Sequence, residues 1–320
     1  MSQSTAGPLT PAESARLGDE DRALATRLLG ELEAGLRTLP DKPEETTRSA
    51  LRALWHLAAG DRVSAELALT QELPALSPAQ RTALGGLISQ RLGGTPLAHL
   101  TERQRFMGLE MLAGPGALIP RRETEIVARA AAEIARRLVT ELPSPMIVDT
   151  CTGSGNVAAA LAVAAPTARV FASDLSEEAV ALAARNMAHL GLGARVTLRA
   201  GDLLAPFETP EHLGLVDLLT CNPPYISTGR TAEMAAEIAA HEPKLAFDGG
   251  PLGIRIVQRL IQEAPRLLRR GGWLAFEVGL GQGPSVAKRL TQGGLYEDVR
   301  SIADDEGNVR VLVARLAGAD

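Results

Sequence analysis

The chain has 320 residues, of which 45% are hydrophobic and 22% charged, with a formal net charge of -5 and a pI near 5.7. This acidic balance argues against a strong non-specific nucleic-acid binder, which needs a basic face, and the apolar runs are too short for a membrane span. The chain has two cysteines, Cys151 and Cys221, which we expect to be reduced thiols rather than a disulfide. The first residues carry no secretion signal, so we expect a cytoplasmic protein.

The first third of the chain predicts a helical region. Residues 1–18 are polar and small, and we expect them to form a disordered tail. In residues 19–104 apolar side chains recur at helical spacing between turn signals, which predicts a small helical domain. Residues 105–118 hold two short apolar pieces around Gly114-Pro115-Gly116, a pattern that predicts a β-hairpin linking this domain to the next.

From residue 119 to residue 320 the sequence alternates between helix and strand patterns. The expected strands cover residues 146–149, 170–173, 196–199, 215–221 and 272–278, followed by a last pair at 298–302 and 309–316. The expected helices cover residues 123–139, 156–164, 177–190, 253–268 and 283–290. Strands separated by helices imply a doubly wound, mostly parallel sheet, so the fold class is α/β.

A glycine-rich turn follows the first of these strands. Residues 150–155 read Thr-Cys-Thr-Gly-Ser-Gly and open a helix, so Gly153 and Gly155 allow a tight turn at a helix N-terminus that favours an anionic group. This pattern alone also fits a dinucleotide site, or a turn that serves only helix–sheet packing. Asp149, just before the turn, would repel a pyrophosphate but could hold a cationic amine.

Acidic residues also end or follow the next two strands. Asp174 is placed to accept both hydroxyls of a ribose, and Gly201-Asp202-Leu203 is a turn that could flank an adenine. A ligand with an ammonium, a carboxylate, a sulfonium, a ribose and an adenine fits this set. We therefore predict a site for S-adenosylmethionine, with S-adenosylhomocysteine as the product.

The apolar run at 213–221 predicts a buried strand that ends in Asn222-Pro223-Pro224-Tyr225. The prolines fix φ and remove two backbone donors, which leaves carbonyls free to accept hydrogen bonds. Asn222 adds a side-chain carbonyl and Tyr225 a flat face, so the corner suits a planar –NH2 group. The alternative is an ordinary strand that ends in a proline turn.

Both motifs belong to the carboxyl edge of the predicted sheet, where open α/β sheets bind ligands. We hypothesise that Asn222 and the Pro223 carbonyl accept the two protons of an amide or amino nitrogen and orient it for in-line attack, while Tyr225 holds its plane. Transfer from a sulfonium disperses charge, so a positioned, desolvated site needs no strong general base. The predicted catalytic residues are Asn222, Pro223 and Tyr225.

The chain resembles the release-factor glutamine methyltransferases of the HemK/PrmC type over about residues 46–316. The resemblance rests on residues 91–100 (Arg-Leu-Gly-Gly-Thr-Pro-Leu-Ala-His-Leu), on 118–125 (Leu-Ile-Pro-Arg-Arg-Glu-Thr-Glu), on the glycine turn with Asp174, on the Asn222–Tyr225 corner, and on Glu277-Val-Gly279. DNA and RNA adenine methyltransferases share the corner. The segment at 118–125 joined to it is much more specific.

The resemblance implies a Rossmann-like class I methyltransferase domain at residues 119–320, preceded by a helical domain that recognises a peptide chain release factor. It implies methylation of the glutamine nitrogen in that factor's Gly-Gly-Gln loop, a step of protein methylation in translation termination. The implied cofactor-binding residues are Asp149, Cys151, Thr152, Gly153, Ser154, Gly155, Asp174, Asp202, Leu203 and Asn222. The implied substrate-binding residues are Asn222, Pro223, Pro224, Tyr225, Arg121 and Glu125, although Glu125 at a helix N-terminus is also explained by the helix dipole.

Cys151 fills a position that is normally glycine in the family. A cysteine there is tolerated if φ is negative, but it could narrow the methionine pocket. This departure leaves open a related enzyme that acts on another protein or a small molecule. The residues are also compatible with an adenine-N6 nucleic-acid methyltransferase or with a non-catalytic cofactor-binding module. The five histidines show no metal-ligand spacing, so we expect no metal, and we expect a monomer without direct nucleic-acid or membrane contact.

Overall fold

The computed structural model describes residues 16–230 and 236–318. The chain divides into two compact units, Met1–Gly114 and Pro115–Asp320. This division falls between the predicted boundaries at 104/105 and 118/119. The tail predicted at 1–18 lies outside the described residues except for 16–18, where Leu17 is buried in the core of the first unit.

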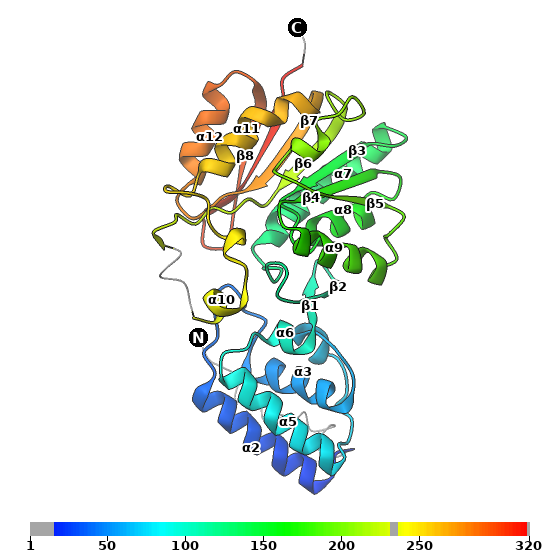
Figure 1. The fold of residues 1–320 in the computed structure, drawn as a ribbon, viewed down its shortest axis with the longest axis vertical. Helices are drawn as coiled ribbons and strands as arrows, with labels where there is room; N and C mark the ends of the chain where they lie inside the picture. Colours follow the sequence, from blue (N-terminus) through cyan, green and yellow to red (C-terminus); the bar gives the residue numbers. More distant parts are fainter. Residues whose placement is uncertain (1–15, 231–235, 319–320) are drawn as a thin grey trace. The chain divides into compact units, whose positions relative to one another are not determined.

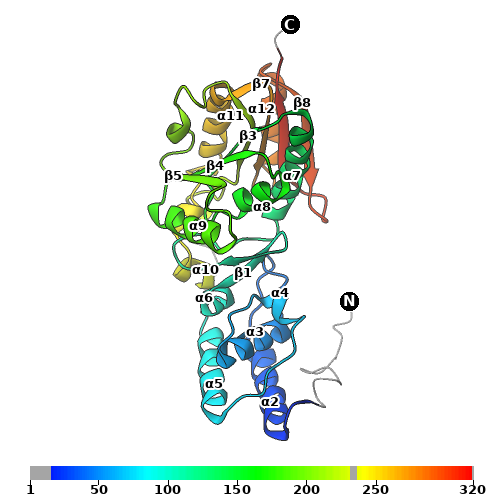
Figure 2. The same cartoon turned by 90° about the vertical axis from the view of Figure 1, so that its right-hand side faces the viewer.

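The first unit consists of helices and one hairpin (Figures 1 and 2). Its described helices are α2 (Asp19–Gly35), α3 (Thr47–Ala59), α4 (Ala65–Ala68), α5 (Pro78–Leu92) and α6 (Leu97–Thr101). Capping boxes begin α3 and α5, because the side chains of Thr46 and Ser77 accept from the third backbone N–H of each helix. Leucines of α2, α3 and α5 are buried together in one hydrophobic core that includes Trp55. The indole N–H of Trp55 donates to the Pro74 carbonyl (2.8 Å).

The hairpin pairs β1 (Arg103–Phe106) with β2 (Leu109–Leu112) in antiparallel register. Its turn is therefore Met107-Gly108, and the prediction of a hairpin around Gly114-Pro115-Gly116 was wrong about the position. Met107 and Gly108 both have a positive φ (50° and 80°), which is the geometry of a two-residue hairpin turn. The strands themselves lack the alternating apolar pattern that would have marked them.

The second unit alternates helices and strands as the sequence predicts. Its elements are α7 (Thr124–Glu141), β3 (Met146–Thr150), α8 (Asn156–Ala164), β4 (Arg169–Asp174), α9 (Glu177–His189), β5 (Val196–Ala200), β6 (Val216–Cys221), α10 (Ala236–His241), α11 (Arg255–Leu267), β7 (Leu268–Glu277), α12 (Gly283–Gln292), β8 (Tyr296–Ala303) and β9 (Val309–Leu316). Short 3-10 turns cover Ala205–Phe207 and Lys244–Ala246.

The strand predicted at 272–278 begins earlier, at Leu268, directly after α11. Gly271 and Gly272, expected near the start of the strand, instead form an irregularity inside it, where the pairing register with β6 shifts. Gly271 has a φ of 73°, and a Cβ on Gly272 would lie 2.9 Å from the Val216 carbonyl oxygen. Only glycine allows this close approach of the two strands.

The sheet of the second unit has the order β5-β4-β3-β6-β7-β9-β8. Its first five strands are parallel, and β9 pairs antiparallel with both β7 and β8. Helices α7 and α8 pack on one side of the sheet and α11 on the other (Figure 2). The strand order reverses between β3 and β6, so the crevice at their carboxyl ends is where this fold binds ligands.

Candidate functional site

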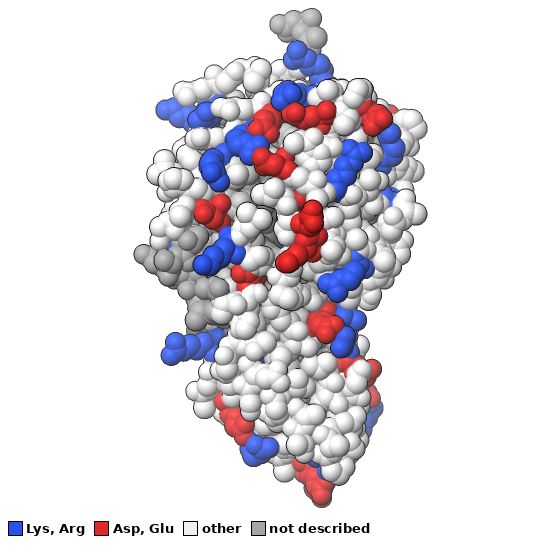
Figure 3. Space-filling view, viewed as in Figure 1, with Lys and Arg blue, Asp and Glu red and all other residues white. Residues whose placement is uncertain are grey.

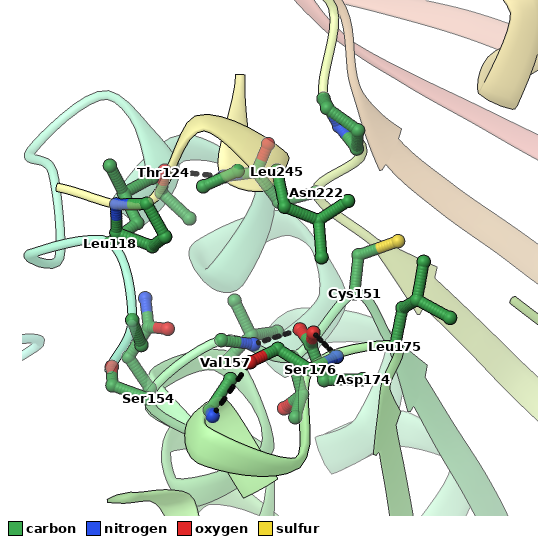
Figure 4. Close-up of a pocket in the computed structure, with 18 of the residues that line it drawn as sticks. Leu118, Thr124, Cys151, Ser154, Val157, Asp174, Leu175, Ser176, Asn222 and Leu245 are labelled. Atoms are coloured by element: carbon green, nitrogen blue, oxygen red, sulfur yellow. Dashed lines mark hydrogen bonds between the residues drawn. The ribbon is translucent and has the colours of Figure 1, made fainter. Parts of the chain in front are cut away.

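A cleft opens at the carboxyl ends of β3, β4 and β6, inside the second unit (Figure 4). It encloses about 1130 Å³ including the solvent at its mouth, which is enough for a ligand of nucleoside size. Of the residues predicted for the cofactor or the substrate, the lining includes Arg121, Asp149, Cys151, Thr152, Gly153, Ser154, Asp174, Asp202, Leu203, Asn222 and Pro224. Residues distant in the sequence thus meet at one edge of the sheet.

Asp149 lies at the end of β3 with 1% of its surface exposed. Its carboxylate accepts hydrogen bonds from the hydroxyls of Thr152 and Thr220, both at 2.6 Å. Burial raises the pKa of Asp149 to about 6, and these two hydroxyls oppose the rise. The cleft therefore contains a buried carboxylate that a bound cation would stabilise.

Asp174 lies at the end of β4, beside the glycine turn. Its Oδ2 accepts from the Gly153 N–H (2.8 Å) and its Oδ1 from the Ser176 N–H (2.9 Å), and Figure 4 shows these bonds around Asp174. Burial raises the pKa of Asp174 as well, although the backbone donors oppose the rise. Each oxygen keeps a lone pair that can accept from a ligand hydroxyl.

The glycine turn contains a cysteine in a conformation that favours glycine. Cys151 has a φ of 55°, so the negative φ that would let a cysteine be tolerated here without strain is not what the backbone adopts. Gly155, which precedes α8, does not line the cleft but packs closely against α9. A Cβ on Gly155 would lie 2.8 Å from the Met187 methyl carbon, and its φ is 81°. The turn therefore has one position that requires glycine and one strained position that tolerates cysteine.

The Asn222–Tyr225 corner faces the cleft with two of its four residues. Asn222 and Pro224 line it, whereas Pro223 and Tyr225 are not among the described residues that do so. The Asn222 Nδ2 donates to the Thr124 hydroxyl (2.9 Å), which leaves the amide oxygen to accept from a ligand. Tyr225 instead donates its hydroxyl proton to Glu277 Oε1 (2.9 Å).

The two charged residues predicted to bind substrate have different surroundings. Arg121 is buried at the cleft wall and donates to Glu242 Oε1 (2.5 Å), while Glu242 Oε2 accepts from the Ile119 N–H (3.0 Å). Glu242 thereby ties the chain before α7 to the segment after α10. Glu125 pairs with Arg129 one turn along α7 and is not among the described residues of the cleft wall.

Several residues of this site were absent from the sequence prediction. Thr220, Thr124 and Glu242 hold Asp149, Asn222 and Arg121, respectively, and Leu245 and Arg255 add to the cleft wall. Thr124 belongs to the segment at 118–125 on which the family resemblance rests. Glu242 follows the corner in His241-Glu242-Pro243, a segment that by its sequence is either an ordinary turn or a lid at the edge of the substrate site.

Lysine, arginine, aspartate and glutamate side chains are interspersed on the face of the second unit that Figure 3 shows.

The described residues contain no group of three or more histidine, cysteine or acidic side chains arranged to hold a metal ion. Within residues 16–230 and 236–318, no helix is both long enough and apolar enough to span a membrane.

Comparisons with known proteins agree on a methyltransferase. A family model described as a methyltransferase domain matches residues 147–241. A Moorella thermoacetica protein named release factor glutamine methyltransferase is 40% identical over 240 residues, which cover 75% of this chain and 81% of that protein. A Geobacter sulfurreducens protein of the same name is 34% identical over 281 residues, covering 87% of this chain and 93% of that protein.

Solved structures support the fold of the second unit. The hMettl16 catalytic domain, determined in complex with the MAT2A 3'UTR hairpin 6, has a TM-score of 0.51 to this chain at 15% identity. The match covers 67% of this chain and 77% of that one. At such low identity the likeness concerns the fold alone.

Proposed function

The chain belongs to the release factor glutamine methyltransferase family, and we propose that it transfers a methyl group from S-adenosylmethionine to the side-chain nitrogen of a release-factor glutamine, in the Gly-Gly-Gln loop. One structural observation supports the proposal independently of the similarity to known sequences. The amide of Asn222 faces the same cleft as the carboxylates of Asp149 and Asp174, with its nitrogen already bonded to Thr124. A polar acceptor for an amide substrate and a set of groups for the methyl donor thus share one cleft.

The residues of the cleft fit S-adenosylmethionine. Asp149 offers a buried carboxylate to the ammonium of the ligand, and Asp174 offers acceptors to the ribose hydroxyls. Ser154 Oγ lines the cleft, is buried and has no hydrogen-bond partner among the described residues, so a ligand carboxylate could satisfy it. Leu203 supplies an apolar wall and Asp202, which accepts from Arg259 (3.0 Å), a polar one for the adenine.

When bound, S-adenosylmethionine supplies a methyl group on a positively charged sulfur. The contribution of the chain is to position its partner. An amide nitrogen is a weak nucleophile, so the Asn222 Oδ1, which faces the cleft, accepts one of its protons and orients it. Acceptance of the second proton by the Pro223 carbonyl stays a prediction, because Pro223 is not among the described residues of the cleft wall. Holding the reacting atoms in this way replaces a strong base with orientation.

The surroundings of Tyr225 differ from those expected of a ring that stacks on the substrate amide. Its hydroxyl is bonded to Glu277 behind the corner, and it is not among the described residues of the cleft wall. We therefore assign Tyr225 to holding the backbone of the corner. Stacking of its ring on the substrate stays a prediction.

The first unit supplies, in our proposal, the recognition of the release factor. The 281 residues aligned with the Geobacter sulfurreducens protein are more than the second unit contains, so the kinship extends into the helical unit. A cytoplasmic location and a monomeric state stay predictions. Size-exclusion chromatography with light scattering checks the second of these.

The decisive test incubates the protein with methyl-labelled S-adenosylmethionine and a purified release factor. A matched factor with its loop glutamine replaced by alanine is the control for the acceptor. We expect label on the wild-type factor only. Label on both factors would move the acceptor elsewhere, and label on added DNA or RNA but on neither factor would establish an adenine methyltransferase instead.

A further inference from the structure

The two cysteines of the chain lie on neighbouring strands at the carboxyl edge of the sheet. Cys221 ends β6, and Cys151 follows directly after β3. The two strands are parallel and paired, with Thr150 opposite Cys221. Paired strands lie about 4.8 Å apart and Cys151 is one residue, about 3.3 Å, further along, so its Cα lies about 6 Å from that of Cys221. A disulfide spans this separation of Cα atoms.

The left-handed backbone at Cys151 determines on which face of the sheet its thiol lies. Side chains alternate along a strand and Cys221 shares the face of its partner Thr150, so an extended residue 151 would point to the opposite face. The φ of Cys151 is 55° instead of the roughly -120° of a parallel strand, which swings its Cβ around the N–Cα bond to the other side. Cys151 accordingly packs against the buried hydrophobic cluster that contains Cys221.

The two thiols, both free, differ in their access to solvent. Cys151 is partly exposed and lines the cleft, where Figure 4 shows its sulfur in yellow. Cys221 is 1% exposed and is not among the described residues of the cleft wall. Burial raises the pKa of the Cys221 thiol well above its ordinary value, and the neighbouring Cys151 thiol adds to the rise. A reagent in the cleft therefore meets Cys151 first.

We propose that Cys151 and Cys221 form a modification site, a thiol pair that a low-molecular-weight disulfide converts into an internal disulfide that lowers methyl transfer. Formation of the bond is independent of the proposed function, whereas its effect on methyl transfer rests on that function. The bond would join the glycine turn, which contains Cys151, to the acceptor corner, which begins at the residue after Cys221. The chain has only these two cysteines, so a single internal product can form.

The reaction is a thiol–disulfide exchange in two steps. The Cys151 thiolate attacks one sulfur of the reagent, whose S–S bond breaks, and the first reagent thiolate leaves and takes up the proton that Cys151 lost. The Cys221 sulfur then attacks the Cys151 sulfur, the mixed disulfide breaks, and the proton of Cys221 goes to the second reagent thiolate. Both cysteines are thus oxidised, and the reagent is reduced to two thiols. The second step is intramolecular, which offsets the low acidity of Cys221.

The bond would change the geometry of the candidate site. Two sulfurs that are not bonded stay about 3.5 Å or more apart, whereas a disulfide holds them at about 2 Å. The glycine turn and the corner must absorb part of this difference, and Asn222 is the residue directly after Cys221. A displacement of about 1 Å costs on the order of 100-fold in rate, so we expect the oxidised protein to lose at least about 10-fold in kcat.

The first experiment needs no substrate. The reduced protein is incubated with hydroxyethyl disulfide at mildly alkaline pH, alkylated, and digested with trypsin without reduction. Cleavage after arginine places Cys151 in peptide 138–169 and Cys221 in peptide 200–230. We expect these peptides to be joined, in a protein that has lost the two thiol hydrogens and carries no reagent.

Two variants serve as matched controls for the peptide map. Cys221→Ser lacks the second thiol, so it should stop at a mixed disulfide between Cys151 and one half of the reagent. Cys151→Ala keeps the Cβ of the turn but lacks the exposed thiol, so it should not react on the same timescale.

The second experiment measures methyl transfer to a release factor before and after oxidation, once the reagent has been removed. Wild-type kcat should fall at least about 10-fold and return on addition of dithiothreitol. The activity of Cys151→Ala, whatever its level, should be the same with and without the reagent. S-adenosylmethionine should slow the oxidation of the wild type several-fold, because it occupies the cleft that Cys151 lines.

The outcomes keep the two proposals apart. A wild-type protein that stops at the mixed disulfide, or that joins two chains instead of the two peptides of one chain, would overturn the inference. Internally oxidised protein with undiminished methyl transfer would overturn it as well. A reduced wild-type protein that labels no release factor, or whose oxidation is unaffected by S-adenosylmethionine, would instead contradict the proposed function, while the peptide map would still decide whether the two thiols join.

Discussion

Replacing Asp149 by asparagine should stabilise the cofactor-free protein at pH 8, although it removes a residue of the candidate site. Burial at the end of β3 raises the pKa of Asp149 from 3.8 to about 6. Asparagine has the same shape, and it can accept from one of the hydroxyls of Thr152 and Thr220 and donate to the other. The variant therefore keeps the packing and loses only the charge.

The magnitude follows from the raised pKa. The folded protein holds the Asp149 proton more tightly than the unfolded chain does, so this group contributes stability below pH 3.8 that is lost as the pH rises through about 6. At about 1.36 kcal/mol for each tenfold difference in proton affinity, the loss is up to about 3 kcal/mol. The advantage of the variant should be about 3 kcal/mol at pH 8 and roughly half of that at pH 5.

Urea unfolding at the two pH values, without cofactor, measures this difference. Added S-adenosylmethionine should raise the unfolding midpoint of the wild type and leave the variant unchanged, because the ligand stabilises only a protein that binds it. Asp217→Asn is the matched control on β6. Asp217 accepts from the Met146 N–H (2.7 Å) and pairs with Arg269, so its loss of charge should destabilise by about 1 to 3 kcal/mol.

Two results would refute this reasoning. A variant less stable than the wild type at pH 8 would mean that the hydroxyl bonds outweigh the cost of burying the charge. A stability difference that is the same at pH 5 and pH 8 would mean that Asp149 does not titrate in this range. Either result would remove the argument that the site holds a carboxylate in need of a cation.

Three further predictions concern the acceptor, the cleft wall and the glycine turn. Asn222→Ala should abolish methyl transfer while the Kd for S-adenosylmethionine, measured by calorimetry, rises at most moderately; near-normal turnover would refute its role. Glu242→Gln replaces the charged partner of a buried guanidinium and should lower the free energy of unfolding in urea by about 3 kcal/mol. Glu125→Gln, whose partner Arg129 has an exposed side chain, should cost less than about 1 kcal/mol. Gly155→Ala should lower the unfolding temperature more than Gly191→Ala does, because both have a positive φ but only the first brings its new methyl within 2.8 Å of a neighbour; equal shifts would contradict the clash.

Local patterns in the sequence determined the fold class and the chemistry of the edge. The alternation of helix and strand patterns after residue 119 places Asp149, Asp174 and Asn222 at strand ends, and parallel strands bring such ends together. The strand predicted at 272–278 starts earlier, at Leu268, and the hairpin around Gly114 was placed wrongly. In both cases a glycine with positive φ shaped the backbone, and a glycine in the sequence does not say whether it ends a strand or bends one.

The tertiary structure decided which side chains hold the site in place. Thr124 lies 98 residues from Asn222, and Glu242 lies 121 residues from Arg121. Such partners leave no spacing pattern, because they meet only after the sheet and the segments around the cleft have packed. The left-handed backbone at Cys151 is of the same kind, since an identical residue adopts either sign of φ and only the surrounding turn selects one. The sequence by itself therefore determined what the edge of the sheet can bind, and packing decided which way each group points, because direction depends on neighbours that are distant along the chain.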